Sequence, residues 1–162
     1  MTDLTDLDDV DRRIIAALQV EGRRSFASIA AELRVPASSV RYRIKRLEDE
    51  GVLQVVGIAN PLAIGFDRLA MLGVRTAPGA IRRVCERLAA LPETSYVVMT
   101  TGRFDILVEV VCRDVPHFID VLENRIGTME EVVATESFMV LEAHKLAYGW
   151  GVPGVESAPA EG

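Results

Sequence analysis

The first fifty residues carry a helical repeat of apolar side chains that one proline interrupts, and this pattern restricts the possible folds most strongly. The repeat predicts a first helix that ends near Gly22, with Asp8 or Asp9 as its cap and with inward members Leu7, Val10, Ile14 and Leu18. Ser25 is placed to cap a second short helix. Proline lacks a backbone donor and disfavours a helical residue before it, so Pro36 ends this pattern.

A third helix is expected from Ala37 to Glu50, followed by Gly51 in a left-handed conformation. Its inward stripe consists of Val40, Ile44 and Leu47. At about 100° per residue, Arg43 flanks this stripe and six side chains point away from it: Ser38, Ser39, Arg41, Tyr42, Lys45 and Arg46. Hydroxyls near the start, an aromatic ring in the middle and cations toward the end are typical of a helix in the major groove. We therefore predict that these six side chains bind double-stranded DNA.

The distribution of charge favours DNA binding over a solvated helix bundle. The net charge of the chain is −6, but residues 1–60 contribute only −1 of it. No carboxylate lies between Glu32 and Glu48, whereas an ordinary exposed helix would mix both signs. A three-helix bundle with a charged outer face stays the simpler alternative, and the one-sided charge weakens it.

The N-terminal residues resemble the Lrp/AsnC family of transcriptional regulators. The motifs that carry the resemblance are Leu7-Asp8-x-x-Asp11-Arg12-x-Ile14, Gly22-Arg23, Ile29-Ala30, Arg43-Ile44-x-Arg46-Leu47-Glu48 and Gly51-Val52-Leu53. The family commonly has a glycine in the turn and a serine at the start of the recognition helix, where this chain has Arg34 and Pro36. A cap supplied instead by Ser38 would begin the helix one or two residues later.

The second half predicts an α+β domain with an antiparallel sheet. Leu53 to Ala59 is expected to be a connecting strand that ends at the turn Asn60-Pro61. The segments after it give the order β-α-β-β-α-β of a ferredoxin-like fold: strands at 69–76, 94–101, 104–112 and 132–143, and helices at 78–91 and 115–126. The predicted boundaries are a helix-turn-helix, winged-helix-like domain at 1–53, a linker strand at 54–65, a ferredoxin-like domain at 66–150 and a disordered tail at 151–162.

Two of these strands, 69–72 and 106–108, are apolar without alternation. A sheet with one wet face would alternate, so a partner should cover the second face, and an identical sheet is the simplest one. We expect a charged residue at Met71 or Val108 to disrupt this contact.

The resemblance extends to about Trp150 and implies what this half does. In the family it is a regulation domain that dimerises through its sheets, often assembles further into tetramers or octamers, and binds small effectors, usually amino acids. The matching signature is the turn Thr101-Gly102-Arg103-Phe104-Asp105. The implied effector-binding residues are Thr101, Gly102, Arg103, Phe104 and Asp105, with Thr135 and Ser137 on the last strand.

Other roles for this turn stay open. Gly102 also suits a tight hairpin, and Asp105 also suits a bond to the backbone of its own loop. Arg103 can bind the effector's carboxylate or pair across a subunit contact with a glutamate such as Glu109.

The expected function is sequence-specific transcription regulation modulated by a small effector, in the cytoplasm, without cofactor, metal or enzymatic activity. An acidic N-terminus and the lack of an apolar run of about 20 residues indicate no signal peptide and no membrane span. Cys85 and Cys112 are expected to be buried thiols, and His117 and His144 to be surface residues. Lys145, Tyr148 and Trp150 resemble a common C-terminal motif of the family.

The alternatives are a siroheme decarboxylase, which resembles the same architecture but relies on histidines absent from 100–111, and a ligand-binding oligomer without DNA binding.

Overall fold

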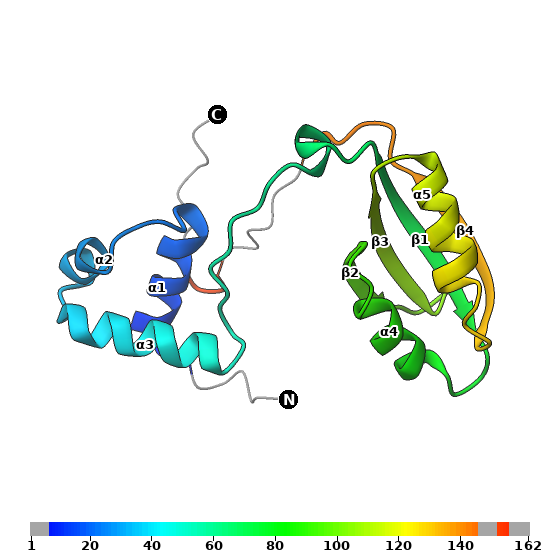
Figure 1. Ribbon diagram of the computed structural model, residues 1–162. Helices are drawn as coiled ribbons and strands as arrows, with labels where there is room; N and C mark the ends of the chain where they lie inside the picture. Colours follow the sequence, from blue (N-terminus) through cyan, green and yellow to red (C-terminus); the bar gives the residue numbers. More distant parts are fainter. Residues whose placement is uncertain (1–6, 146–151, 156–162) are drawn as a thin grey trace. The chain divides into compact units, whose positions relative to one another are not determined.

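The computed structural model describes residues 7–145 and 152–155, which form two compact units (Figure 1). The first unit contains residues 7–57 together with 152–155, and the second contains residues 58–145. The predicted α+β class and the order of elements are confirmed. No helix in the described ranges is long and apolar enough to cross a bilayer.

The first unit is built from three helices: α1 (Asp9–Val20), α2 (Phe26–Leu33) and α3 (Ala37–Asp49). Asp8 caps α1 in a reciprocal capping box with Asp11, and Ser25 caps α2 by accepting from the backbone N–H of Ser28. The apolar stripes meet in one core whose fully buried members include Ile14, Ile29, Val40 and Leu47. The inward faces predicted from periodicity are therefore confirmed.

The turn between α2 and α3 is made without the glycine and serine that the family commonly uses. Arg34 adopts the left-handed conformation (φ 55°, ψ 43°) and ends α2. Pro36 occupies the N-cap position of α3 without any side-chain cap. The proposed cap by Ser38 is wrong, because Ser38 lies inside the helix and the backbone N–H groups of Ser39 and Val40 bond to the Pro36 carbonyl. Helix α3 therefore begins at Ala37, as predicted.

The segment after α3 differs from the prediction. Gly51 has the expected positive φ of 69°, and the N–H of Val52 bonds to the Leu47 carbonyl. Residues 53–60 form no strand, and a short 3-10 helix follows at Pro61–Ile64. The predicted linker strand is wrong for this single chain, because a strand requires a ladder with a neighbouring strand and the ladders of the described sheet do not include residues 53–60.

The predicted tail also has described structure in part. Val152 and Val155 form an isolated bridge, and Val152 packs against the core of the first unit. Arg12 Nη1 donates to the Pro153 carbonyl at 3.3 Å. Tyr148 and Trp150 lie outside the described residues, whereas Lys145 is described and exposed.

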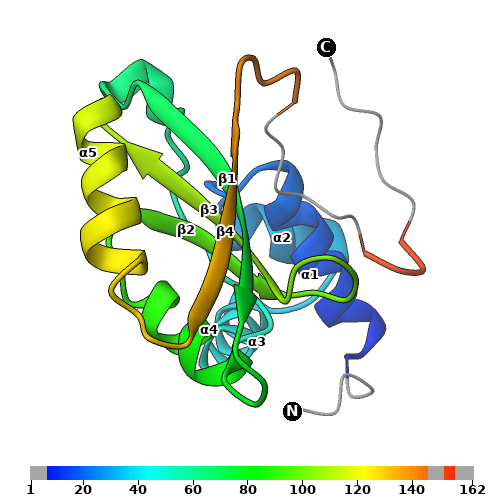
Figure 2. The same ribbon diagram turned by 90° about the vertical axis from the view of Figure 1, so that its right-hand side faces the viewer.

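The second unit is a four-stranded antiparallel sheet with the order β2-β3-β1-β4. Its strands are β1 (Arg68–Thr76), β2 (Thr94–Met99), β3 (Ile106–Cys112) and β4 (Val132–Met139). The helices α4 (Ile81–Ala89) and α5 (Val115–Asp120) lie on one face, and α5 continues as a π-helix at Val121–Ile126 (Figures 1 and 2). The ferredoxin-like order is confirmed, and the predicted regular helix to Ile126 is corrected to this mixed form.

The core of the second unit lies between the sheet and its helices. Leu72 and Val74 of β1 and Val108 of β3 are fully buried there, against Val84 and Leu88 of α4. The choice of Val108 as a residue of a partner-covered face is therefore wrong. Its neighbour in sequence, Leu107, points to the opposite face because successive side chains alternate along a strand.

Candidate nucleic-acid interface and ligand turn

Helix α3 presents a polar, cationic face outward. Ser38, Arg41, Tyr42 and Lys45 are exposed, with Tyr42 at 71% and the Lys45 side chain at 75%, and Ser39 is half-buried. The Lys45 ammonium contacts Asp49 of the same helix at 3.1 Å, a largely exposed pair that contributes little to stability. These side chains are therefore available to a partner.

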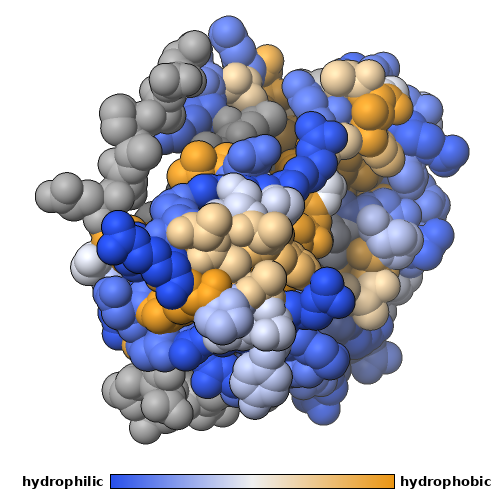
Figure 3. Space-filling view, turned by 90° about the vertical axis from the view of Figure 1, so that its left-hand side faces the viewer, coloured by the Kyte–Doolittle hydropathy of each residue, from blue (hydrophilic) through white to orange (hydrophobic). Residues whose placement is uncertain are grey.

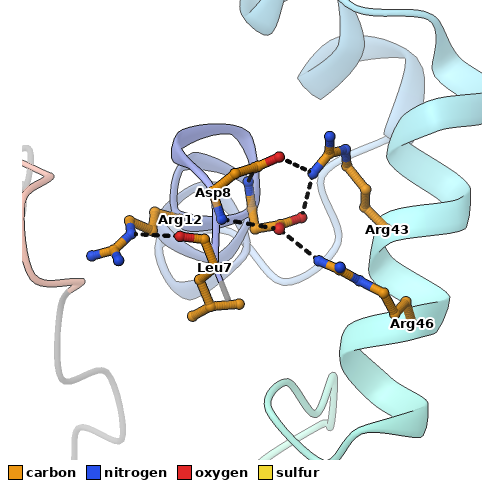
Figure 4. Close-up of polar contacts among 6 residues, drawn as sticks. Leu7, Asp8, Arg12, Arg43 and Arg46 are labelled. Atoms are coloured by element: carbon orange, nitrogen blue, oxygen red, sulfur yellow. Dashed lines mark hydrogen bonds and ion pairs between the residues drawn. The ribbon is translucent and has the colours of Figure 1, made fainter. Parts of the chain in front are cut away.

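Arg46 differs from the expectation that it points freely outward. Its Nη2 donates to Asp11 Oδ2 at 2.6 Å, and only 31% of its side chain is exposed. Arg43 Nη1 donates to Asp11 Oδ1 at 2.8 Å and to Asp8 Oδ2 at 2.7 Å (Figure 4). Two arginines of α3 are thus held by carboxylates at the start of α1.

Asp11 is the centre of this contact, which we call the Asp11 clamp. It is 1% exposed, and its carboxylate also accepts from the Asp8 N–H. Hydrogen bonds to the Asp11 carboxylate raise the pKa of Arg46 and of Arg43 above their usual value. The clamp thus ties α3 to α1 on the same side as the buried stripe Val40, Ile44 and Leu47, and together they determine which side chains α3 presents outward.

The sequence contained a signal for Asp11 that the prediction did not use. Asp11 stands three, four and seven residues before Ile14, Ile15 and Leu18, and therefore belongs to the inward stripe of α1. A carboxylate in an apolar stripe requires a cationic partner. Arg43 and Arg46, one helical turn apart, are the partners that it finds.

The turn before β3 holds the end of β1 through its own backbone and one carboxylate. Asp105 Oδ2 accepts from the Thr76 N–H at 2.7 Å and from the Thr76 hydroxyl at 3.4 Å. The Asp105 N–H bonds to the Val74 carbonyl, and the Thr100 N–H bonds to the Asp105 carbonyl. Gly102 has a φ of 111°, which only glycine adopts readily. These contacts favour the structural role for Asp105.

Phe104 and Arg103 fold back over the face of the sheet that has no helices. The Phe104 ring lies on Gly73, where an added Cβ would be only 2.6 Å from ring atoms, and it meets Phe138 edge to face at 6.1 Å. The Arg103 guanidinium stacks on Phe104 and its Nη2 is 2.7 Å from Glu136 Oε2.

Arg103 and Glu136 lie beside a shallow hollow of about 200 Å³, which Arg75, Phe104, Ala134 and Thr135 also line. Within this chain the glutamate partner of Arg103 is therefore Glu136. Glu109, named as a possible partner across a subunit contact, binds the Ser95 hydroxyl here.

The structure brings some of the predicted ligand residues together and separates others. Thr135 lines the hollow beside Arg103 and Phe104, whereas Ser137 pairs in register with Leu72, whose side chain faces the helices. Glu136, between them in sequence, points to the same face as Phe104 and was missed by the prediction. Sequence alone does not reveal the register of β4, so it gave no signal for this choice.

The helix-free face of the sheet carries two rows of residues across the strands. One row is Phe138, Met71, Glu109 and Tyr96, and the other is Glu136, Gly73, Leu107 and Val98. Tyr96 is 52% exposed and Phe138 is 45% exposed. Among the described residues of this unit, the helices lie on the other face of the sheet (Figure 2).

Both halves of the sequence match known domain families. Residues 7–48 match the AsnC-type helix-turn-helix domain, and residues 69–150 match the Lrp/AsnC ligand binding domain. An HTH-type transcriptional regulator of Pyrococcus furiosus is 33% identical over 143 residues, which cover 88% of this chain and 97% of the relative.

Two solved structures have the same fold as this chain. The structure of AsnC from Escherichia coli is 26% identical with a TM-score of 0.72, over 86% of this chain and 95% of that one. The leucine response regulatory protein of Mycobacterium tuberculosis is 25% identical with a TM-score of 0.80, over 87% and 97%.

Proposed function

The chain belongs to the Lrp/AsnC family of DNA-binding transcriptional regulators with a ligand-binding domain. From this premise we propose a separate role for each of its two units. Helix α3 reads the major groove with five exposed or half-exposed side chains: Ser38, Ser39, Arg41, Tyr42 and Lys45. Arg46, paired with Asp11, has a positioning role in this proposal. The single observation that carries it is an outward face with cations and hydroxyls on a helix whose inward face is fixed.

Salt dependence and sequence preference test this proposal separately. Lys45→Ala should lower the slope of log affinity against log salt by about one unit, because one phosphate contact is lost. Tyr42→Ala should change the preferred sequence. Arg13→Ala, an exposed cation on α1, is the matched control and should change neither. Unchanged slope and preference in both α3 variants would contradict the assignment of α3.

We also propose that the helix-free face of the sheet joins two copies of this chain into a dimer, which assembles further into a tetramer or octamer. The exposed Tyr96 and Phe138 and the half-buried Met71 and Leu107 on this face support the proposal, since adjoining apolar side chains are seldom left in water. Leu107→Asp should give monomers in sedimentation. Ile119→Asp, at an exposed position of α5, should leave the assembly unchanged. A soluble wild-type monomer would overturn the proposal.

The effector that we propose is an amino acid bound beside the turn 101–105. Arg103 offers a donor for a carboxylate, Glu136 or Asp105 offers an acceptor for an ammonium, and Phe104 offers an apolar surface. Of the two acceptors, Glu136 is favoured because its carboxylate lines the hollow and is 39% exposed, whereas Asp105 is not among the lining residues and its Oδ2 holds the Thr76 N–H. The name of the M. tuberculosis relative, a leucine response regulator, supports an amino acid. Because its proposed partner is DNA, we propose that the protein acts in the cytoplasm.

A thermal-shift screen of the twenty amino acids identifies the ligand, since one that binds only the native state raises the melting temperature. Calorimetric titration then separates the roles. Glu136→Gln should weaken the best ligand about 10- to 150-fold, the loss of one charge-assisted hydrogen bond. Asp105→Asn should lower the melting temperature and change affinity less. The reverse pattern would assign the ammonium to Asp105, and no shift with any amino acid would contradict an amino-acid effector.

A further inference from the structure

A hollow of about 510 Å³ lies between the start of α2 and the outward face of α3. Its apolar wall is formed by Phe26 and Ala27 of α2 and by Ala37 and Tyr42 of α3. Phe26 is a large apolar side chain, and it is nevertheless 37% exposed. Figure 3 faces this side of the molecule and shows apolar surface surrounded by hydrophilic residues.

The edge of the hollow is cationic. Arg41 and Lys45 stand one turn apart on α3, and Ser38 adds a hydroxyl near the start of the helix. None of the described residues that line the hollow carries a carboxylate. The surroundings thus attract a polyanion, while the wall itself offers apolar contact.

Only one group of an unmodified DNA major groove is apolar, the C5-methyl group of thymine. The base edges otherwise present hydrogen-bond donors and acceptors, which the side chains of Phe26, Ala27 and Ala37 in this wall cannot satisfy. Cations at the edge suit the phosphates beside such a base. The geometry points to a thymine methyl group as the occupant of this hollow, so that Phe26, Ala37 and Tyr42 determine part of the operator sequence. This inference rests on the proposed DNA-binding function and adds a specific base to it.

The test replaces thymine by uracil, which pairs with adenine in the same way and lacks only the methyl group. The operator is first selected from random duplexes with the full-length protein, and each of its thymines is then replaced singly. We expect one position in each half-site at which uracil lowers affinity about fourfold, the value of one buried methyl group. The remaining thymines should tolerate uracil.

Variants of the hollow complete the test. In Phe26→Ala and in Tyr42→Ala, uracil at the same position should change affinity less than about twofold, because the wall that contacts the methyl group is gone. Tyr42 is largely exposed, so its replacement should leave the fold intact, and a thermal melt checks Phe26→Ala. Val20→Ala removes an exposed apolar side chain elsewhere in the unit and should keep the fourfold effect.

The possible failures are distinguishable. An operator that is bound equally well with every thymine replaced overturns the thymine assignment and leaves DNA binding standing. A uracil effect that persists in both hollow variants also overturns it. If no duplex is selected from the random library, the proposed function itself fails.

Discussion

Each of the two units of this protein is stabilised internally in a different way. The helical unit combines a small apolar core with the Asp11 clamp, and Asp11 is the buried charged residue among those described. The core of the sheet unit consists of apolar residues throughout, and its strands are aligned by backbone ladders. In the first unit the Asp11 clamp adds a directional contact between α1 and α3 to the apolar packing. In the second unit the strand register gives this directionality, because a one-residue slip of a strand exposes its whole inner face.

The same difference determines where the functional side chains lie. On α3 the outward set follows from fixing the inward one, so residues close in sequence act together. In the sheet unit Arg103 meets Glu136, thirty-three positions away, because strand pairing brings β4 beside β1. A substitution in the Asp11 clamp should therefore affect the whole of helix α3, whereas a substitution in the sheet should affect only the residues around it.

The largest expected effect comes from Asp11→Ala. It leaves Arg43 and Arg46 without their shared carboxylate and removes half of the capping box of α1. We expect a loss of about 3 kcal/mol in the unfolding free energy of the helical unit, at the lower end for a buried pair because both guanidiniums are partly exposed. Urea unfolding followed by hydrogen exchange in each unit measures it.

Asp49→Ala is the matched control for that variant. It breaks the largely exposed pair with Lys45 and should cost less than about 1 kcal/mol. A comparable loss in both variants, or an equal loss of protection in the sheet unit, would remove the contrast between the two units.

Gly73→Ala tests the sheet unit at the place where the Phe104 ring packs closely against β1. The added Cβ would lie 2.6 Å from Phe104 ring atoms, so the ring must move away from β1. We expect a loss of about 2 kcal/mol from this overpacking. Gly57→Ala places its Cβ in open space and should change stability by less than about 0.5 kcal/mol. Equal thermal melts for the two variants would show that the Phe104 contact carries no weight.

Arg34→Gly should stabilise the helical unit by about 0.5 to 1 kcal/mol. Arg34 adopts a left-handed conformation that a side chain disfavours, and glycine removes this strain while losing more entropy on folding. Arg34→Ala keeps a β-carbon and should give no gain. A rise in melting temperature for alanine as large as for glycine would mean that the arginine side chain, and not the backbone, is the cause.

The smallest effect concerns the pH dependence of Asp8. The hydrogen bond from the Asp11 N–H, with Arg43 beside it, holds the pKa of Asp8 below its usual value of 3.8. A lowered pKa in the folded state adds stability that is present above about pH 3.8 and is lost as the pH falls through the folded pKa. Asp8→Asn keeps a cap and should be less stable than the wild type at neutral pH, with the difference fading in acid. A difference in stability that stays constant down to acid pH would mean that the cap alone, and not the charge of Asp8, causes it.

The sequence determined the elements of this protein well wherever local periodicity decided them. The stripes of α1 and α3, the cap at Ser25, the left-handed Gly51 and the order of strands and helices all follow from contacts within a few residues. Family motifs then indicated transcription regulation, which the domain matches confirm.

Tertiary structure alone decided how distant residues combine. The pairing of Asp11 with Arg46, the register that selects Glu136 rather than Ser137 and the burial of Val108 each depend on neighbours far along the chain. The coil at 53–60 likewise depends on tertiary structure, because the strands of the described sheet form no ladder with this segment. Periodicity gives the direction of a side chain relative to its own element. It does not give the rotation or register of one element against another, because these are fixed only when the packed side chains meet.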